Sequence, residues 1–301
     1  MNIYIGVTDT DWYEYIKDKK LSEVNFWRPG SQRFKAIEQN DVFLFKLHYP
    51  DNYIVGGGFF VSYSYLPTYL AWEAFKDGNG TSSLSKLNKV IESYRKKNNM
   101  LESNPYIGCI ILTDVFYLDK SQWIPAPDDF GKYTVQGKRY SAEEGVGKEL
   151  YCQIQDLLKL KQYTNYNEPE FAYSLTKHRI GQGAFRVIVT DNYQRRCAIT
   201  GEKTLPVLEA AHIKPVSENG PYIASNGLLL KSDFHTLFDD GYITINPDYR
   251  VDVSKRLHED YGNGKDYYKY HGQKLIIIPN EENNKPSKEF LAWHNENVFL
   301  G

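Results

Sequence analysis

The feature of this sequence that most constrains its fold is a polar stretch without hydrophobic periodicity near the middle of the chain, over residues 161–169. Such a stretch has no apolar face to bury, so it is typical of a linker between domains. The chain has 301 residues, which exceeds the roughly 100–200 residues of a common single domain. We therefore expect two domains, one on each side of this stretch.

The composition excludes several broad classes of protein. Hydrophobic residues make up 41% and charged residues 25%, which is typical of a globular chain. No apolar run approaches the roughly 18–20 residues of a membrane helix, and the beginning, with Asp9 and Asp11, lacks the basic flank of a secretory signal. Cys109, Cys152 and Cys197 lie too far apart for a disulfide framework or a four-cysteine zinc site. We expect a protein of the reducing cytoplasm with no membrane partner.

The first half alternates short β-rich runs with helical segments and has no regular strand–helix–strand repeat. This pattern predicts an α+β domain around a curved sheet or small barrel. The Gly56–Gly58 run inside a β-rich segment indicates a bulge or a close approach of backbones. The expected strands cover residues 2–7, 41–46, 53–61 and 105–118, and the expected helices cover residues 10–19, 70–75 and 83–97.

The second half has a different pattern of predicted secondary structure, with short strands, loops and a terminal helix. A helix is expected over residues 148–160, a strand over 274–278 and a last helix over 287–299, which Pro286 begins. The predicted domain boundaries follow: residues 1–147 form the first domain, 148–176 a helix and linker, and 177–301 the second domain.

Four residues of the second half form a pattern that suits phosphodiester hydrolysis. His212 ends a short β-rich run, and Asn226 lies in a turn-prone segment. His235 and Asp239 are four residues apart on a short helix, so both side chains project from one face. A strand histidine that faces a helical His/Asp pair can provide a base beside a divalent metal ion, and these are the two needs of that reaction.

The order of the motifs around these residues resembles the HNH nuclease family, with its ββα-metal fold. The resemblance covers roughly Arg179–Phe299. Within the family, this segment is similar to a bacterial subgroup that includes restriction-type enzymes. It implies an endonuclease domain that acts on double-stranded DNA. In chain order, the motifs are Ile180-Gly181-Gln182, Phe185-Arg186, Tyr193, Arg196-Cys197-Ala198-Ile199-Thr200-Gly201, Ala210-Ala211-His212-Ile213, Asn226-Gly227-Leu228-Leu229-Leu230 and His235-Thr236-Leu237-Phe238-Asp239.

The resemblance implies a role for each residue of the site. His212 is expected to be the general base that activates water, and Asn226 is expected to hold the loop and position His212. His235 is expected to be a metal ligand. Asp239 is expected either to be a second ligand, one helical turn later, or to serve the turn at the helix end. The expected ion is Mg²⁺ or Mn²⁺, with waters in its shell.

The sequence departs from the family at two places. Many relatives carry a metal-binding Asp or His immediately before the base, where this chain has Ala211. Glu209 has the same strand parity as Ala211, so it either reaches the ion or remains a solvated or salt-bridged carboxylate. Some relatives also have a second cysteine after the position of Cys197, which completes a zinc ribbon. This chain has none there, so no structural zinc is expected.

The net charge of −2 does not by itself propose a nucleic-acid partner, but a few placed cations suffice for phosphate contacts. Such contacts are one interpretation of the cations near the motifs, and a solvated charged face is the other. Cutting both strands with one active site per chain favours a homodimer. The candidate DNA-binding residues are Arg186, Arg195, Arg196 and Lys214.

The first half carries motifs around Trp27, Gly56–Phe60, Trp72 and Asn79-Gly80 that resemble the PUA, EVE and SRA group of small barrels. Several members of that group enclose a modified base in an aromatic pocket. A base flipped out of a duplex recovers lost stacking on aromatic rings, worth about 1–3 kcal/mol per base. Trp27 and Trp72 are therefore the candidate pocket walls, and core packing is the alternative for both. In the same pocket, Asn79 or Glu73 is expected to read the base edge and Arg28 to hold a phosphate.

These resemblances together predict a restriction or phage-defence endonuclease. Its first domain directs the second to modified bases, such as methylated or hydroxymethylated cytosine. One alternative keeps the nuclease but has the first domain sense a partner protein or a nucleotide signal. The other is a catalytically decayed nuclease that only binds DNA, for which Ala211 is the argument.

Overall fold

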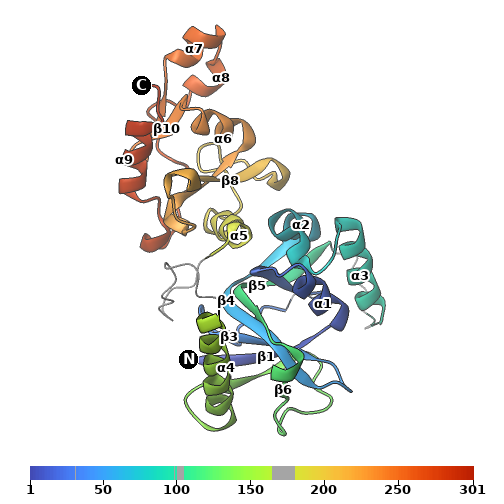
Figure 1. Cartoon of the computed structure of the whole chain (residues 1–301). Coiled ribbons are helices and arrows are strands. Elements are labelled where there is room, and N and C mark those ends of the chain that lie inside the picture. Colours follow the sequence, from blue (N-terminus) through green and yellow to red (C-terminus); the bar gives the residue numbers. More distant parts are fainter. Residues whose placement is uncertain (31, 98, 100–104, 165–179) are drawn as a thin grey trace. The chain divides into compact units, whose positions relative to one another are not determined.

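The computed structural model describes residues 1–30, 32–97, 99, 105–164 and 180–301. The chain divides into two compact units, Met1–Arg179 (unit 1) and Ile180–Gly301 (unit 2), shown in Figure 1. The helix predicted over residues 148–160 is present and longer, as α4 (Gly145–Thr164) at the end of the described part of unit 1. The predicted linker begins inside this helix, and its residues 165–169 lie outside the described residues.

Unit 1 is built on a seven-stranded sheet with the strand order β2-β5-β4-β3-β1-β7 and with β6 paired to β4. Strands β1 and β3 are parallel, and the other pairs are antiparallel. The strands are β1 (Asn2–Thr8), β2 (Glu23–Arg28), β3 (Val42–Leu47), β4 (Tyr53–Pro67), β5 (Tyr106–Tyr117), β6 (Ile124–Pro125) and β7 (Gly137–Ser141). The predicted α+β class is confirmed.

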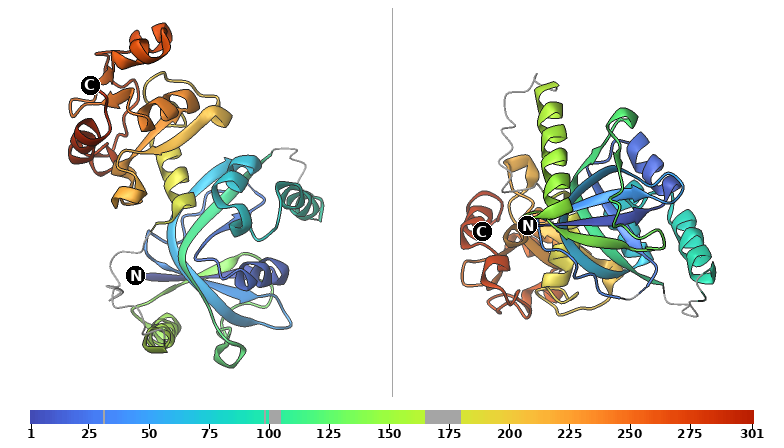
Figure 2. Two further views of the ribbon diagram at one scale, coloured as in Figure 1. Left: turned by 45° about the horizontal axis from the view of Figure 1, so that its top comes forward. Right: turned by 90° about the horizontal axis from the view of Figure 1, so that it is seen from below.

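Both faces of this sheet pack against apolar cores. Alternate residues of a strand point to opposite sides, so a single strand contributes side chains to both cores. In β3, Val42 and Leu44 join a core cluster with Leu150 of α4. Phe43 joins a second cluster that includes residues of α1. The two helices cover different faces of the sheet (Figure 2). The helices of unit 1 before α4 are α1 (Thr10–Asp18), α2 (Thr68–Phe75), η1 (Lys76–Asn79), α3 (Leu84–Lys97) and η2 (Lys120–Gln122).

The glycine run of β4 allows three strands to pack closely. A Cβ at Gly56 would collide with the carbonyl oxygen of Phe116, and one at Gly57 would collide with that of Phe43. The pairing of β4 with β5 shifts register next to this run. The prediction of a bulge or close backbone approach at Gly56–Gly58 is therefore confirmed.

Unit 2 contains the ββα arrangement that positions the site. Strands β8 (Leu208–His212) and β9 (Gly227–Lys231) pair antiparallel, and α6 (Ser232–Asp239) follows β9 directly. Helix α5 packs against both strands of this hairpin (Figure 1). The remaining elements of unit 2 are α5 (Gln182–Asn192), η3 (Leu205–Val207), η4 (Val216–Glu218), η5 (Ala224–Asn226), β10 (Ile243–Ile245), β11 (Val251–Val253), α7 (Arg256–Tyr261), α8 (Lys265–Tyr268), η6 (Glu282–Asn284) and α9 (Lys288–Asn297).

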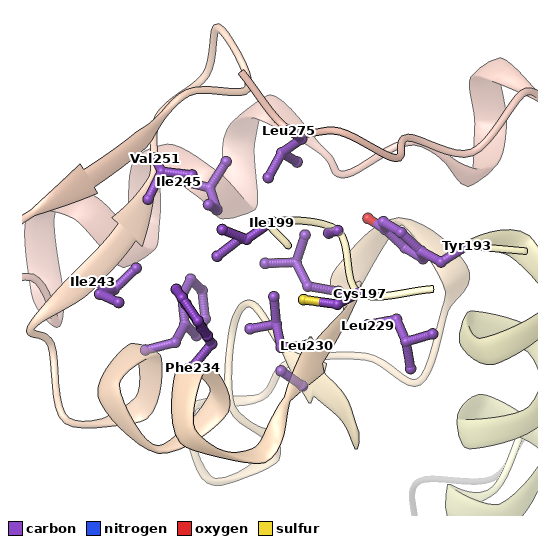
Figure 3. Close-up of a cluster of buried hydrophobic side chains, with 14 of the residues drawn as sticks. Tyr193, Cys197, Ile199, Leu229, Leu230, Phe234, Ile243, Ile245, Val251 and Leu275 are labelled. Atoms are coloured by element: carbon purple, nitrogen blue, oxygen red, sulfur yellow. The ribbon is translucent and has the colours of Figure 1, made fainter. Parts of the chain in front are cut away.

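The core of unit 2 lies between the hairpin, α6 and the β10–β11 pair (Figure 3). Its buried side chains include Cys197, Leu230 and Phe234. The strand predicted over residues 274–278 is wrong, because only Lys274 forms an isolated bridge, with Arg250. Leu275 and Ile277 of this segment are buried in the core instead, whereas Ile276 is exposed.

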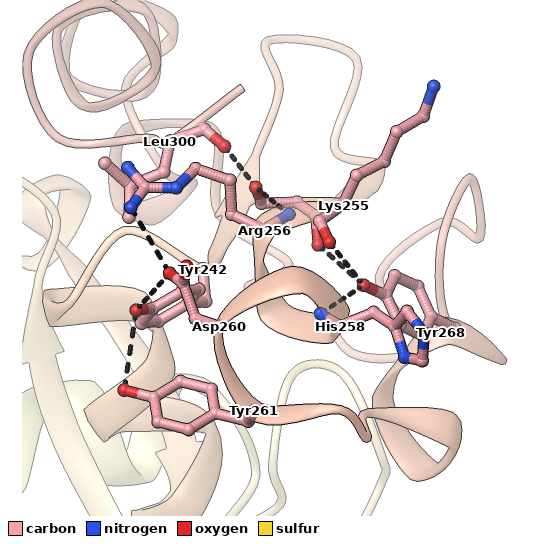
Figure 4. Close-up of polar contacts among 9 residues, drawn as sticks. Tyr242, Lys255, Arg256, His258, Asp260, Tyr261, Tyr268 and Leu300 are labelled. Carbon is pink, nitrogen blue, oxygen red and sulfur yellow. Dashed lines mark hydrogen bonds and ion pairs between the residues drawn. The ribbon is translucent and has the colours of Figure 1, made fainter.

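Polar contacts fasten the C-terminal end of unit 2 (Figure 4). The Tyr268 hydroxyl donates to the carbonyl oxygen of Ser254 at 2.9 Å and accepts from the backbone N–H of His258 at 3.0 Å. The Ser254 hydroxyl donates to the carbonyl oxygen of Leu300, which ties the last residues to this network. None of the described helices is long and apolar enough to cross a membrane.

Asn79 joins α2 to the sheet of unit 1. Its Oδ1 accepts from Asn25 Nδ2 at 2.9 Å, and its Nδ2 donates to the carbonyl oxygens of Ala71 and Lys76, each at 3.0 Å. The residue is 1% exposed, so the amide is committed to internal bonds.

We expect Asn79→Ala to destabilise unit 1 by about 1–3 kcal/mol, because it leaves buried polar partners unpaired. Urea unfolding followed by tryptophan fluorescence measures this, since Trp12, Trp27, Trp72 and Trp123 all lie in unit 1. Glu92→Ala, at an exposed position of α3, is the control. Equal midpoints for the two variants would contradict the structural role of Asn79.

Candidate active site

His212 is held at the end of β8 by aromatic packing. Its ring stacks on Phe185 of α5 with centroids 4.0 Å apart and planes 8° apart, and it meets the ring of Tyr222 edge-on at 5.1 Å. Phe185 reaches this position because Gly227, opposite His212 in the hairpin, leaves room for α5. The imidazole is therefore oriented by rings on two sides.

The electrostatic surroundings keep His212 neutral. Burial lowers its pKa, and the nearby positive charge of His235 acts in the same direction, against the carboxylate of Asp239. Its buried Nε2 has no hydrogen-bond partner among the described residues. A neutral histidine has one unprotonated ring nitrogen, so His212 is suited to accept a proton.

Asn226 fixes the loop that follows His212. Its Oδ1 accepts from the backbone N–H of Lys214 at 2.9 Å, and its Nδ2 donates to the carbonyl oxygens of Lys214 and Pro221, each at 3.0 Å. The backbone of Asn226 also accepts from the N–H of Ile213 at 2.9 Å. Asn226 is fully buried, so this amide closes the loop onto the end of β8.

His235 of α6 lies between two carboxylates. Its Nδ1 is 2.6 Å from Glu209 Oε2, and its Nε2 is 3.2 Å from Asp239 Oδ2. Burial lowers the pKa of His235, but the hydrogen bonds to Asp239 and Glu209 outweigh burial, so its pKa is raised overall. The three residues that the sequence predicts as metal ligands are thus brought together.

The donor types of this trio suit a divalent ion, because carboxylate oxygens and an imidazole nitrogen bind Mg²⁺, Mn²⁺ and related metals. No group of three or more His, Cys, Asp or Glu side chains in the described ranges is arranged around one point as a metal shell. Both ring nitrogens of His235 contact carboxylates instead. The donor atoms of His235, Asp239 and Glu209 are of the types that bind a divalent ion. His235 with Asp239 or Glu209 would hold such an ion.

These groups line one cavity of about 570 Å³ in unit 2. Its wall includes His212, His235, Glu209 and Asp239, together with Arg186 of α5. Arg186 and His212 thus line the same cavity. A base, a carboxylate–histidine cluster and a guanidinium in one cavity are what hydrolysis of a phosphodiester requires.

His294 of α9 also lines this cavity, although it belongs to none of the sequence motifs. Its ring stacks on Phe238 at 3.8 Å, and its two nitrogens lie 2.8 Å from Thr244 Oγ1 and 3.1 Å from the carbonyl oxygen of Phe238. Burial lowers the pKa of His294 to about 4. It is a neutral residue that supports the end of α6, and a lone histidine in the last helix gives no sequence signal for this.

The other predicted DNA-binding cations do not line this cavity. Arg195 pairs with Asp191 at 3.1 Å, and Arg196 donates from Nε to the carbonyl oxygen of Gly201 at 3.4 Å. The ammonium of Lys214 lies over the ring of Trp293, 5.2 Å from its centroid. DNA contacts by these three residues stay a prediction.

The structure brings two of the five residues predicted for a modified-base pocket, Trp27 and Asn79, into direct contact. Trp27 and Arg28 are neighbours on β2, so their side chains leave opposite faces. Trp27 donates from Nε1 to the carbonyl oxygen of Asn79 at 3.1 Å, whereas Arg28 contacts Gln136. Trp72 is half-buried on α2, and Glu73 is exposed. Because the amide of Asn79 is committed to internal bonds, a structural role replaces base reading for that residue.

Comparison with known families decides the class of unit 2. Residues 197–246, which contain β8, β9 and α6, match a family of HNH endonucleases. The chain carries an HNH endonuclease domain. The HNH resemblance that the motifs predict is therefore confirmed.

Solved structures similar to this chain include two proteins at low identity. ASCH from Zymomonas mobilis is 13% identical, with a TM-score of 0.32 over 52% of this chain and 94% of that one. The modification-dependent TagI restriction endonuclease is 13% identical, with a TM-score of 0.28 over 92% of this chain and 75% of that one. No curated protein sequence matches the chain.

We expect Asn226→Ala to lower both the stability of the HNH domain and its rate of DNA nicking. Loss of the amide leaves backbone groups of Lys214 and Pro221 unpaired, at a cost of about 1–3 kcal/mol, and releases the loop next to His212. Asn283→Ala, at an exposed position, is the control. Urea unfolding followed by circular dichroism, with a plasmid-nicking assay, compares the two. Wild-type stability in Asn226→Ala would show that the loop does not depend on this side chain.

Proposed function

We propose that this chain is a metal-dependent DNA endonuclease of restriction type, and that unit 1 directs it to DNA with a modified base such as methylated or hydroxymethylated cytosine. The observation that carries the proposal is the cavity of the HNH domain. A neutral His212 and the His235–carboxylate cluster share its wall with Arg186.

In this mechanism, His212 accepts a proton from a water molecule as the water oxygen forms a bond to phosphorus and the bond from phosphorus to the leaving oxygen breaks. The low pKa of His212 leaves a ring nitrogen unprotonated for this step. Asn226 positions the ring through the loop, and Phe185 does so by stacking. Arg186 holds the phosphate.

Mg²⁺ or Mn²⁺, when bound, would stabilise the charge on the phosphate and on the leaving oxygen. His235 and Asp239 would hold the ion. Glu209 would either bind it too or accept a hydrogen bond from the other ring nitrogen of His235, which fixes the ring. Glu209 would supply the carboxylate that many relatives carry at the position of Ala211, because its side chain contacts His235.

Unit 1 would supply recognition, since it is a separate compact unit with its own sheet and two cores. Trp27, Arg28, Trp72 and Glu73 remain candidates for contacts with a modified base. There are two alternatives: unit 1 senses a protein or nucleotide signal, or the chain binds DNA without cutting it. Each alternative predicts a different result in the cleavage experiments.

We expect His212→Ala to reduce cleavage about 10²–10⁴-fold, because it removes the general base, while DNA binding and folding are retained. His258→Ala, an exposed histidine of α7, should cut like the wild type. Single-turnover cleavage of a labelled duplex with saturating Mn²⁺ measures both. Wild-type rates in His212→Ala would remove this residue from the mechanism, and a wild type that binds but never cuts would favour the decayed nuclease.

The recognition part is tested with matched plasmids that carry unmodified, methylated, hydroxymethylated or glucosylated cytosine. We expect at least one modified plasmid to be cut faster than the unmodified one, in reactions that need Mg²⁺ or Mn²⁺ and stop with a chelator. Equal cutting of all four plasmids would reject base reading and favour the signal-sensing alternative.

A further inference from the structure

A second cavity, of about 360 Å³, lies in unit 1 where β1 and β3 end. Its wall carries Lys46, His48, Tyr49, Lys132 and Tyr133, and the described residues that line it include no carboxylate. The loop with Lys132 and Tyr133 is anchored beside β1 by a bond at 3.1 Å from the N–H of Val7 to the carbonyl oxygen of Gln136. Cations and aromatic rings thus gather at one end of the sheet.

Lys46 is the unusual member of this wall. It continues the row of β3 in which Val42 and Leu44 face an apolar core, and it is 4% exposed. Its ammonium donates to the carbonyl oxygen of Leu47 at 3.0 Å and lies 4.9 Å from the centroid of Phe130. No carboxylate of the described residues lies within ion-pair distance. A buried charge without a counterion is costly, so an anionic ligand in the cavity would compensate it.

The rings at the mouth of the cavity are exposed although they are large. Tyr133 is 90% exposed and Tyr49 is 65% exposed. The ammonium of Lys132 lies over the ring of Tyr49, 4.6 Å from its centroid. Exposed rings beside cations are the combination with which proteins bind nucleic-acid bases together with their phosphates.

We propose that this cavity binds a nucleotide, with its phosphate at Lys46 and Lys132 and its base against Tyr133. The volume lies within the range of about 300–1,000 Å³ of small-molecule sites. The nucleotide is either a unit of the DNA strand, in which case this inference rests on the proposed function, or a free nucleotide. In both cases the site is separate from the five residues that the sequence predicts, because none of them lines this cavity.

The test uses the full chain in EDTA, where binding is measured without cutting. One probe is a fluorescein-labelled duplex with a single 5-hydroxymethylcytosine, followed by anisotropy. The other is 5-hydroxymethyl-deoxycytidine monophosphate, followed by calorimetry. The variants are Lys46→Met, Lys132→Gln and Tyr133→Ala. The controls are Lys120→Gln, whose lysine also lies over a ring, and Tyr261→Ala, which is as exposed as Tyr49.

We expect Tyr133→Ala to weaken binding about 5- to 150-fold, which is the loss of one stacked base. For the duplex, Lys132→Gln should also reduce the slope of the logarithm of the binding constant against the logarithm of the salt concentration by about 1, which corresponds to one lost phosphate contact. Lys46→Met should bind more weakly while its melting temperature stays equal or rises, because a buried charge is replaced by an apolar chain of similar length. The controls should bind like the wild type.

The two probes separate the sources of the nucleotide. Weakened duplex binding assigns the cavity to the DNA strand, and weakened binding of the monophosphate alone assigns it to a free nucleotide. Wild-type binding of both probes in Tyr133→Ala and Lys132→Gln, which change exposed side chains and leave the core intact, would overturn the inference. Cleavage of the matched plasmids is measured separately, so a chain that cuts no DNA but loses binding in these variants would reject the nuclease proposal and keep the cavity.

Discussion

The side chain of Asn226 bonds the N–H and the carbonyl oxygen of Lys214, and the geometry of the HNH domain depends on this buried contact. It fixes the backbone that leaves β8 immediately after His212, while the stack of His212 on Phe185 fixes the ring. An amide is suited to this because it donates and accepts at once. Position and orientation of the proposed base thus come from two different kinds of interaction, one polar and one aromatic.

Two histidines in one cavity have their pKa values shifted in opposite directions. Burial against Phe185 and Tyr222 favours the neutral form of His212, whereas Glu209 and Asp239 favour the charged form of His235. Such a separation of neighbouring titratable groups is typical of active sites. A metal ion held by His235 would replace its proton, because a ligating imidazole is neutral. It also gives Glu209 a definite place beside His235, on the strand that carries Ala211 where many relatives have an acid.

In unit 1, a sheet with two apolar faces carries a cavity with polar lining residues where strands β1 and β3 end. The alternation of β3 places Phe43 and Val42 in different cores, and the same alternation brings Lys46 to the end of an apolar row. A methylene chain can follow apolar neighbours while its ammonium reaches the rim. The exposed rings of Tyr49 and Tyr133 lie at that rim, so cation and rings meet where the strand ends.

The sequence by itself determined the α+β class, the bulge at Gly56–Gly58, the ββα order around the site and the shared helical face of His235 and Asp239. These follow from local patterns, namely periodicity, glycine placement and residue spacing. Local patterns did not predict β2 and β7, which become strands through their pairing partners. They wrongly predicted a strand over residues 274–278, where Leu275 and Ile277 are buried in the core and only Lys274 forms an isolated bridge. Tertiary structure alone decided that Asn79 is buried and fully bonded, that Trp27 and Arg28 leave opposite faces, and that His294 and Phe185 support the site. The reason is physical: burial, partners and pKa shifts arise between residues far apart in the chain, and no single segment encodes them.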